Sequence, residues 1–241
     1  MFSFFKAKEA EVAPLKMDIH SHLLPQLDDG VKSLEESAQL VRQFMALGYT
    51  KLVTTPHVMN DFYRNDPGTI AGGLESLKQF LAKENINVSI EAAAEYYLDE
   101  SLMERVNKNE RLLTFGANYL LFETNFLTEP FQLKEFIFSA TTQGYKPVMA
   151  HPERYQYLVN DFGKAGDLKD RGVLFQVNIP SIIGAYSRPI QKLAIQLIRK
   201  GWVDFIGSDC HNQTQMAILK EAFKNKYFKK ALALPLLNRT L

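Results

Sequence analysis

The fold prediction starts from one stretch near the beginning of the chain, Lys16-Met17-Asp18-Ile19-His20-Ser21-His22. Its first part, Lys16–His20, is predicted to be a strand that ends in a metal-ligand residue type. His20 and His22 are two positions apart, so both imidazoles face one side if the strand continues through them. This His-x-His pattern has little specificity alone, and the rest of the chain decides its meaning.

The other three histidines lie in motifs of the same kind. Imidazole is the commonest metal ligand of proteins and is otherwise scarce, although a single histidine is more often a packed residue than a ligand. Together the four motifs indicate a site for several metal ions. The further motifs are Thr54-Thr55-Pro56-His57, His151-Pro152-Glu153-Arg154 and Ser208-Asp209-Cys210-His211.

The composition excludes several classes of protein. The 28 Lys and Arg residues nearly balance the 27 Asp and Glu residues, which argues against a nucleic-acid-binding domain. A single cysteine, Cys210, rules out an internal disulfide and suits the reducing cytoplasm. No apolar run approaches the roughly 20 residues that a membrane span needs. We predict a flexible N-terminal leader over residues 1–15 and a single domain over residues 16–241, because no linker divides the rest.

Apolar runs alternate with helical patterns along the whole chain. This alternation predicts a parallel sheet, since parallel strands need crossover connections. Ser33 and Glu36 form a predicted capping box for a helix that places Leu34, Ala38, Val41 and Met45 on one face and ends at Gly48. Further helices are predicted at Ile70–Glu84, Glu100–Lys108, Leu133–Gln143, Leu168–Gly172 and Pro189–Gly201. The predicted strands are Lys16–His20, Lys51–Thr55, Asn87–Ala94, Tyr119–Glu123, Pro147–Ala150, Val173–Asn178 and Val203–Gly207.

Seven such strands fit a closed barrel or an open doubly wound sheet, and the positions of the polar residues favour the barrel. In a β/α barrel the carboxyl ends of the strands converge on one mouth. An open sheet would spread the same residues along a line too long for one metal cluster. The residues at or just beyond six different strand ends are His20, His57, Glu95, Glu123, His151 and Asp209.

Three carboxylates at strand ends favour metal binding over packing. Glu123 follows an apolar run, where burying an unpaired carboxylate is costly unless a cation is near. Glu95 follows three alanines that leave space around it, and Asp209 follows another apolar run. Mixed imidazole and carboxylate ligands suit Mn, Fe or Zn.

These motifs resemble the polymerase-and-histidinol-phosphatase (PHP) metallohydrolases. Within that superfamily the chain is most similar to the bacterial metal-dependent protein tyrosine phosphatases associated with capsule and exopolysaccharide synthesis. The resemblance spans roughly residues 16 to 212 and implies a distorted, TIM-like (β/α)7 barrel. It rests on the histidine motifs, on Asp28-Asp29-Gly30 with Leu34-Glu35-Glu36-Ser37, and on Ala94-Glu95, Phe122-Glu123 and Gln176-Val177-Asn178.

The resemblance also implies three divalent metal ions, with Mn favoured over Fe or Zn. His20, His22, Glu95 and Asp209 would hold the first, and Glu95 would bridge to a second held by Glu123 and His151. Asp29, His57 and His211 would hold the third. Arg154 would grip the phosphate and act with Glu95 and Asp209 in catalysis, while a metal-bridged hydroxide attacks phosphorus. The implied partner is a phosphotyrosine protein, a bacterial tyrosine kinase that controls polysaccharide synthesis.

Some alternatives stay open. The family often carries an arginine soon after the last histidine, and here none follows His211, so Arg64 and Arg188 become candidates for a second phosphate ligand. A salt bridge to Glu153 or Asp209 is the alternative role for Arg154.

Other mechanisms and functions are also weighed. A cysteine-nucleophile mechanism is excluded, because the position six residues after Cys210 is Met216. The remaining alternatives are a phosphatase of a small metabolite such as histidinol phosphate or a nucleotide, an amidohydrolase-type barrel, and a non-catalytic phospho-binding module.

Overall fold

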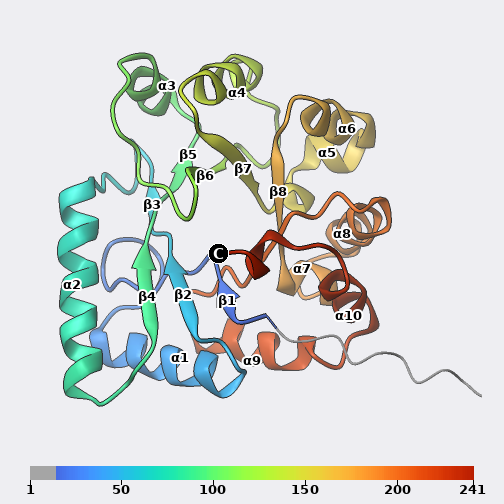
Figure 1. The fold of residues 1–241 in the computed structure, drawn as a ribbon. Helices are drawn as coiled ribbons and strands as arrows, with labels where there is room; N and C mark the ends of the chain where they lie inside the picture. The colour runs from blue at the N-terminus through green and yellow to red at the C-terminus, as the bar shows by residue number, and fades with distance from the viewer. Residues whose placement is uncertain (1–14) are drawn as a thin grey trace, which may run out of the picture.

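The protein is described here by a computed structural model that covers residues 15–241. Helices surround a central set of strands (Figure 1). The strands are β1 (Met17–Asp18), β2 (Lys51–Thr54), β3 (His57–Val58), β4 (Ser89–Ala92), β5 (Glu95–Tyr97), β6 (Tyr119–Glu123), β7 (Lys146–Ala150), β8 (Leu174–Asn178) and β9 (Phe205–Gly207). The helices are α1 (Leu34–Ala46), α2 (Pro67–Lys83), α3 (Glu100–Asn107), α4 (Leu133–Thr142), α5 (Gln156–Asn160), α6 (Phe162–Asp170), α7 (Ile179–Ile183), α8 (Arg188–Lys200), α9 (Gln213–Ala222) and α10 (Lys226–Leu232).

The strands form two parallel sheets that continue one another. One sheet has the order β1-β2-β4 and the other β3-β5-β6-β7-β8-β9. β3 follows β2 after Thr55-Pro56, and β5 follows β4 after Ala93-Ala94, so the nine short strands occupy the seven predicted strand positions. The predicted strand Asn87–Ala94 is therefore wrong in its bounds, and the true element breaks and resumes at Glu95. Pro56 has no amide hydrogen to donate to a ladder, which accounts for the break in the neighbouring strand.

The first and last strands meet and complete the ring. Ser21, just beyond β1, pairs with Cys210, just beyond β9, in one parallel bridge. The backbone N–H and the hydroxyl of Ser208 both donate to the carboxylate of Asp18, each at 2.8 Å. The fold is thus the distorted α/β barrel that the sequence predicts, with a short seam in place of a full ladder between β9 and β1.

The inside of the ring is filled by apolar side chains below the level of the predicted ligands. On β6, Tyr119 and Leu121 belong to this inner cluster, and Glu123 is the next position with the same orientation. Every second residue of a strand faces the same way, so the strands that supply the floor also aim ligands above it. The inner cluster comprises Met17, Ile19, Val53, Ala93, Phe115, Tyr119, Leu121, Val148, Ala150 and Phe205.

The end of the chain covers the amino ends of the strands. Asn238, buried in the short 3-10 helix η2 (Leu237–Arg239), accepts a hydrogen bond from Ile206 N at 2.9 Å and donates one to Ile206 O at 2.8 Å. Leu237 and Leu241 pack against the inner cluster. The C-terminus accordingly lies among the strands in Figure 1. This leaves the carboxyl ends of the strands for the functional site, as in other β/α barrels.

All six predicted helices are present, and α1 shows how the sequence fixes one. Ser33 caps it by accepting a hydrogen bond from Glu36 N at 3.2 Å, as the capping box predicts. The return bond differs, because Glu36 accepts from Lys32 N at 2.7 Å. Two of the four predicted face residues, Ala38 and Val41, are buried, together with Ser37, Leu40 and Phe44.

One predicted helix is several residues too short, and some helices are not predicted at all. The helix predicted at Leu168–Gly172 is α6, which begins six residues earlier at Phe162 and ends at Asp170. Gly163 and Gly166 lie inside it, and glycine lowers the helix propensity on which the prediction depends. The helices α9 and α10, which follow the last predicted ligand, are not predicted from the sequence.

The predicted N-terminal leader falls almost wholly outside the described residues. Its last residue, Leu15, is described and is buried in the main hydrophobic cluster. Among residues 15–241, no helix has the length and apolar character that a membrane span requires.

Candidate metal and phosphate site

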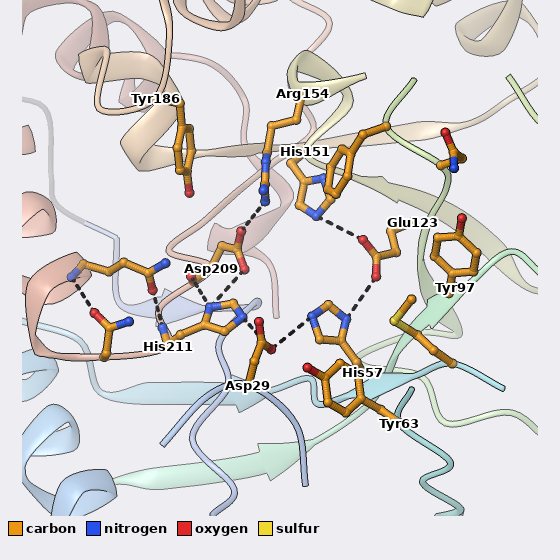
Figure 2. Close-up of a pocket in the computed structure, with 15 residues that line it drawn as sticks. Asp29, His57, Tyr63, Tyr97, Glu123, His151, Arg154, Tyr186, Asp209 and His211 are labelled. Carbon is orange, nitrogen blue, oxygen red and sulfur yellow. Dashed lines mark hydrogen bonds and ion pairs between the residues drawn. The ribbon is translucent and has the colours of Figure 1, made fainter. Parts of the chain in front are cut away.

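The structure brings all nine predicted ligands together at the carboxyl ends of the strands. Six of them surround one cavity in Figure 2, namely Asp29, His57, Glu123, His151, Asp209 and His211. His20 and His22 follow β1, Asp29 lies before α1, His57 and Glu95 open β3 and β5, Glu123 ends β6, His151 follows β7, and Asp209 and His211 follow β9.

His20, His22, Glu95 and Asp209 form the deepest set of ligand atoms, which we call the buried group. One ligand atom from each side chain lies within 4.8 Å of all the others. His20 Nε2 lies 3.1 Å from Glu95 Oε2 and 3.4 Å from Asp209 Oδ1. All four side chains are buried. This is the set that the resemblance assigns to the first metal, and the assignment remains a prediction.

Strand β8 supplies no predicted ligand but orients two of them. Gln176 Oε1 accepts a hydrogen bond from His20 Nδ1 at 2.6 Å, which leaves His20 Nε2 facing the buried group. Gln176 Nε2 donates to Asn178 Oδ1 at 2.8 Å, and Asn178 Nδ2 donates to Asp209 Oδ2 at 2.6 Å. Such outer contacts fix the tautomer and direction of metal ligands. The oxygen Asp209 Oδ1 remains directed at the imidazoles.

Asp28, the residue before the predicted ligand Asp29, supports the ligands from behind. Asp28 Oδ2 contacts His22 Nδ1 at 2.6 Å and accepts a hydrogen bond from His57 N at 3.0 Å. Burial disfavours ionisation of Asp28, but His22 and the hydrogen bonds overcome it and hold the pKa of this carboxyl well below its usual range. A Cβ at Gly30 would collide with the carbonyl oxygen of His22, so this turn needs glycine. The sequence predicts the turn but not the contact between Asp28 and His22.

Asp29, His57 and His211 form a second set, which we call the outer group. Asp29 Oδ1 lies 3.6 Å from His57 Nε2 and 3.4 Å from His211 Nε2. His22 also offers a nitrogen to this set, with all four ligand atoms within 4.8 Å of one another. The side chain of Asp29 is 56% exposed, whereas His57 and His211 are 13% and 12% exposed. The outer group therefore faces the cavity and the solvent.

A third set links the other two, and it differs in part from the expected one. His57 Nδ1 lies 3.2 Å from Glu95 Oε2 and 3.0 Å from Glu123 Oε1, and these three residues have ligand atoms within 4.8 Å. The resemblance names His151 here, and His151 Nε2 lies 2.9 Å from Glu95 Oε1 but 3.9 Å from Glu123 Oε2. His151 has a left-handed backbone with φ of 35°, which is rare outside glycine and is found at functional sites.

The residues fit divalent cations. His57 Nδ1 is buried and has no hydrogen-bond partner in the structure, although two carboxylate oxygens lie close to it. Buried polar atoms are rarely left unpaired, and a cation shared with the carboxylates would satisfy this one. Burial disfavours the charged form of His20, but Glu95 and Asp209 outweigh it and raise the pKa of this imidazole to about 9. The site thus favours positive charge, and its nitrogen and oxygen donors suit Mn, Fe or Zn.

Arg154 ends the 3-10 helix η1 (Pro152–Arg154) and reaches over the cavity (Figure 2). Its Nη1 lies 3.1 Å from Asp209 Oδ2. Its Cζ lies 4.7 Å from the ring centre of Phe126 and 5.0 Å from that of Tyr186. Of the two salt bridges considered from the sequence, the one to Asp209 is present. It uses the oxygen that faces away from the imidazoles, so Asp209 can contact Arg154 and a metal at once.

The cavity has a volume of about 430 Å³ and an aromatic rim. Neither Arg64 nor Arg188 lines it, and Arg64 Nε instead donates to Asn60 O at 2.6 Å. The positions after His211 that line the cavity are neutral, Asn212 and Gln215. The aromatic residues of the rim are Tyr63, Tyr97, Phe126 and Tyr186.

Cys210 lies between two ligands but does not face the cavity. Its side chain is buried, and its Sγ contacts Asn212 O at 3.6 Å. Burial raises the pKa of the thiol to about 12, so the thiolate that a cysteine nucleophile requires is disfavoured. The structure agrees with the sequence in giving this residue no nucleophilic role.

Comparison with known families identifies the family of the chain. The family described as capsular polysaccharide synthesis, CpsB/CapC, matches residues 16–231. The protein belongs to this family. The putative tyrosine-protein phosphatase CapC of Staphylococcus aureus is 29% identical over 214 residues, which cover 88% of this chain and 84% of CapC. The tyrosine-protein phosphatase YwqE of Bacillus subtilis is 26% identical over 196 residues, covering 81% of this chain and 77% of YwqE.

A solved structure of the CpsB/CapC family has the same fold. This structure is one of a set of crystal structures of YwqE from Bacillus subtilis and CpsB from Streptococcus pneumoniae. The two proteins are described there as metal-dependent tyrosine phosphatases. The TM-score is 0.77 at 25% identity, and the match covers 88% of this chain and 89% of the other. The resemblance inferred from the motifs is confirmed at the level of the family and the fold.

Several residues of the site were missed by sequence reasoning, among them Asp28, Phe126 and Tyr186. Asp28 could have been found only by asking which of two adjacent aspartates is buried, and nothing in the sequence answers that. Phe126 and Tyr186 lie in loops, where no periodicity indicates the direction of a side chain.

Proposed function

We propose that this member of the CpsB/CapC family is a metal-dependent protein tyrosine phosphatase. The observation that carries the proposal is a single cavity that joins the metal-ligand groups, the guanidinium of Arg154 and an aromatic rim. The guanidinium of Arg154, together with cations that the ligand groups would hold, suits a phosphate, and the aromatic side chains of the rim suit the ring of a tyrosine. The names of the relatives support the same activity.

Different side chains have different roles toward the substrate. Arg154 binds phosphate oxygens through its planar fork of N–H groups. Divalent cations, when bound, supply a water of lowered pKa and neutralise charge on the phosphate. Glu95 and Asp209, both buried, would hold the cations from the side of the site that faces the inner cluster. The leaving phenolate has a conjugate acid with a pKa of about 10, so it departs more readily than an alkoxide would.

We further propose that three divalent ions bind, with Mn favoured over Fe or Zn. The three sets of ligand atoms support this number, and their nitrogen and oxygen donors support the kind of metal. The nine ligands remain those predicted from the resemblance, with His57 well placed to serve two ions because its two nitrogens face different carboxylates.

The proposed partner is a phosphotyrosine protein, specifically a bacterial tyrosine kinase that controls capsule or exopolysaccharide synthesis. The family description supports the link to capsule synthesis, and the names of the relatives support a phosphotyrosine protein, whereas the kinase follows only from the resemblance of the motifs. A cytoplasmic location is supported by a single, buried and unpaired cysteine. We assign the whole activity to one domain over residues 16–241.

The test is a comparison of substrates with the full chain loaded with Mn²⁺. We expect kcat/KM to be highest for phosphotyrosine peptides and para-nitrophenyl phosphate, and much lower for histidinol phosphate and nucleotides. A higher kcat/KM for histidinol phosphate would overturn the proposal in favour of a metabolite phosphatase. Tight phosphopeptide binding without turnover would overturn it in favour of a binding module.

A further inference from the structure

We propose that Phe126 and Tyr186 are positioning residues that form an aromatic clamp on the guanidinium of Arg154. The clamp allows one arginine to bind the phosphate of the substrate without a second arginine nearby. This inference rests on the proposed function, because it assigns a role to residues beside the same cavity. Neither Phe126 nor Tyr186 belongs to the motifs that carry the family resemblance.

Three contacts fix the guanidinium. Both ring centres lie within the roughly 6 Å at which a guanidinium and an aromatic face attract each other. They are 4.7 Å from Arg154 Cζ for Phe126 and 5.0 Å for Tyr186. The third contact joins Nη1 to Asp209 Oδ2 at 3.1 Å. Among residues 15–241, Asp209 is the polar partner found for this guanidinium and takes one edge of the fork, so the other N–H groups can meet phosphate oxygens.

Phe126 is itself held in place by the neighbouring segment. Its backbone oxygen accepts a hydrogen bond from Gln156 N at 2.7 Å. Its ring stacks on the ring of Tyr155, with centroids 5.6 Å apart and planes tilted by 28°. Tyr155 is fully buried, and its hydroxyl accepts a hydrogen bond from Thr124 N at 3.2 Å. The loop after β6 is therefore tied to the segment that carries Arg154.

Tyr186 is presented by a short connection between α7 and α8. Gly184 ends α7 with a φ of +85°, a conformation that glycine adopts without strain. Ala185 N donates to Pro180 O at 3.0 Å, and Ser187 begins the next helix by accepting from Ile190 N. These hydrogen bonds fix the backbone on both sides of Tyr186. Figure 2 shows its ring beside Arg154.

The clamp answers a need of this cavity, which has little other positive charge in the described part of its wall. The positions that follow His211 in the cavity wall are neutral, so Arg154 is the only arginine that lines the cavity among the described residues. Cations bound below would repel an unclamped guanidinium toward solvent whenever no phosphate is present. Ordering a long side chain costs conformational entropy, and contacts made before the substrate arrives lower the cost of binding it.

The alternative role for these rings is to contact the phenyl ring of the substrate. The two roles differ in their effect on ligands that have no ring. A clamp affects the binding of inorganic phosphate as much as the binding of an aryl phosphate. A substrate contact affects aryl phosphates alone.

The experiment compares Phe126→Ala and Tyr186→Ala with the matched variants Phe126→Tyr and Tyr186→Phe, which keep the rings. Each full-length protein is loaded with Mn²⁺, and the binding of inorganic phosphate is measured by calorimetry. We expect each alanine variant to bind phosphate about 3- to 30-fold more weakly, the range that cation–π contacts support. The ring-keeping variants should bind within about twofold of wild type, and metal content should not change.

A second arm tests whether the rings act through Arg154. In an Arg154→Ala background, Phe126→Ala should weaken phosphate binding no further. Unchanged phosphate affinity with a raised KM for para-nitrophenyl phosphate would overturn the clamp in favour of a substrate contact. Loss of metal in the alanine variants, or no phosphate binding by wild type, would also overturn it. If wild type binds phosphate through the clamp but hydrolyses no phosphomonoester, the proposed function fails while the clamp stands.

Discussion

The buried group and the outer group use the same kinds of ligand atom but hold them differently. In the buried group, His20, His22 and Asp209 each have a second buried partner that sets their direction. In the outer group, Asp29 is 56% exposed, and its carboxylate contacts two imidazoles across the open side of the cavity. The first group is part of the barrel interior, whereas the second is part of its mouth.

If both groups hold a metal as proposed, this difference predicts that the metal of the outer group exchanges more readily than that of the buried group. Ligands fixed by hydrogen bonds are already oriented before a cation arrives, so little order is lost on binding. An exposed carboxylate competes with water and loses side-chain freedom when it binds. We therefore expect the buried group to bind its metal more tightly than the outer group.

Removing all metal tests both groups at once and should have the largest effect. Extensive chelation should abolish phosphatase activity, and added Mn²⁺ should restore it, because the ions supply the activated water and the charge neutralisation. With a limiting amount of chelator, the first equivalent should leave from the outer group. Turnover and metal content by mass spectrometry follow the titration, and full activity in metal-free protein would contradict the prediction.

Breaking the buried group alone should have the next largest effect. Glu95→Ala should lose at least one metal and most activity while the barrel remains folded, because removing this carboxylate leaves the charge of the cations uncompensated. The control is Glu91→Ala, an exposed residue on β4 whose carboxylate pairs with Lys51. Metal stoichiometry and circular dichroism check the result. An unchanged stoichiometry in Glu95→Ala would show that this residue is not a ligand.

Breaking the outer group alone should have a smaller and reversible effect. Asp29→Asn should lower the occupancy of one metal and leave the metal of the buried group in place. Turnover should fall less than in Glu95→Ala and recover at higher Mn²⁺ concentration. Asp61→Asn, at another exposed aspartate, is the control. If Asp29→Asn emptied the buried group as well, the two groups would not be separable.

Changing the phosphate ligand should leave both groups intact and have the smallest effect. Arg154→Lys keeps the charge but loses the fork geometry, so turnover should fall about tenfold, which corresponds to about 1.4 kcal/mol of transition-state stabilisation. Metal content and thermal stability should stay near wild type. Arg64→Lys, outside the cavity, provides the control. If losses in Arg154→Lys follow unfolding or loss of metal, its contact with Asp209 is structural.

The sequence predicts well that these side chains converge, because the carboxyl ends of parallel strands must meet in a barrel, whereas their role as metal ligands remains a prediction. That rule requires only the order of strands and the residue at the end of each. It does not require exact strand bounds, so the break at Thr55-Pro56 and the wrong bounds of Asn87–Ala94 did no harm. Glu95 is the first residue of β5 in the structure and still faces the same centre.

The sequence cannot predict which ligands share an ion. The position of His151 depends on its left-handed backbone, and the double contact of His57 depends on where β3 resumes after the break. Asp28 and Asp29 are the same residue type side by side, and only the packing of the turn separates a buried support from an exposed ligand. The rings of Phe126 and Tyr186 meet at Arg154 through loops from different parts of the chain, which no local pattern encodes.

The seam between β1 and β9 also determines when, during protein synthesis, the site can assemble. Asp18 and Ser208, which hydrogen bond across it, are 190 positions apart in the chain. His20 and His22 leave the ribosome early, whereas Asp209 and His211 leave it near the end. The buried group contains Asp209 and the outer group contains His211, so neither has all its ligands until the last strand has been made. A nascent chain released before that point lacks one side chain of each group, so the proposed binding of metal would have to follow the synthesis of β9.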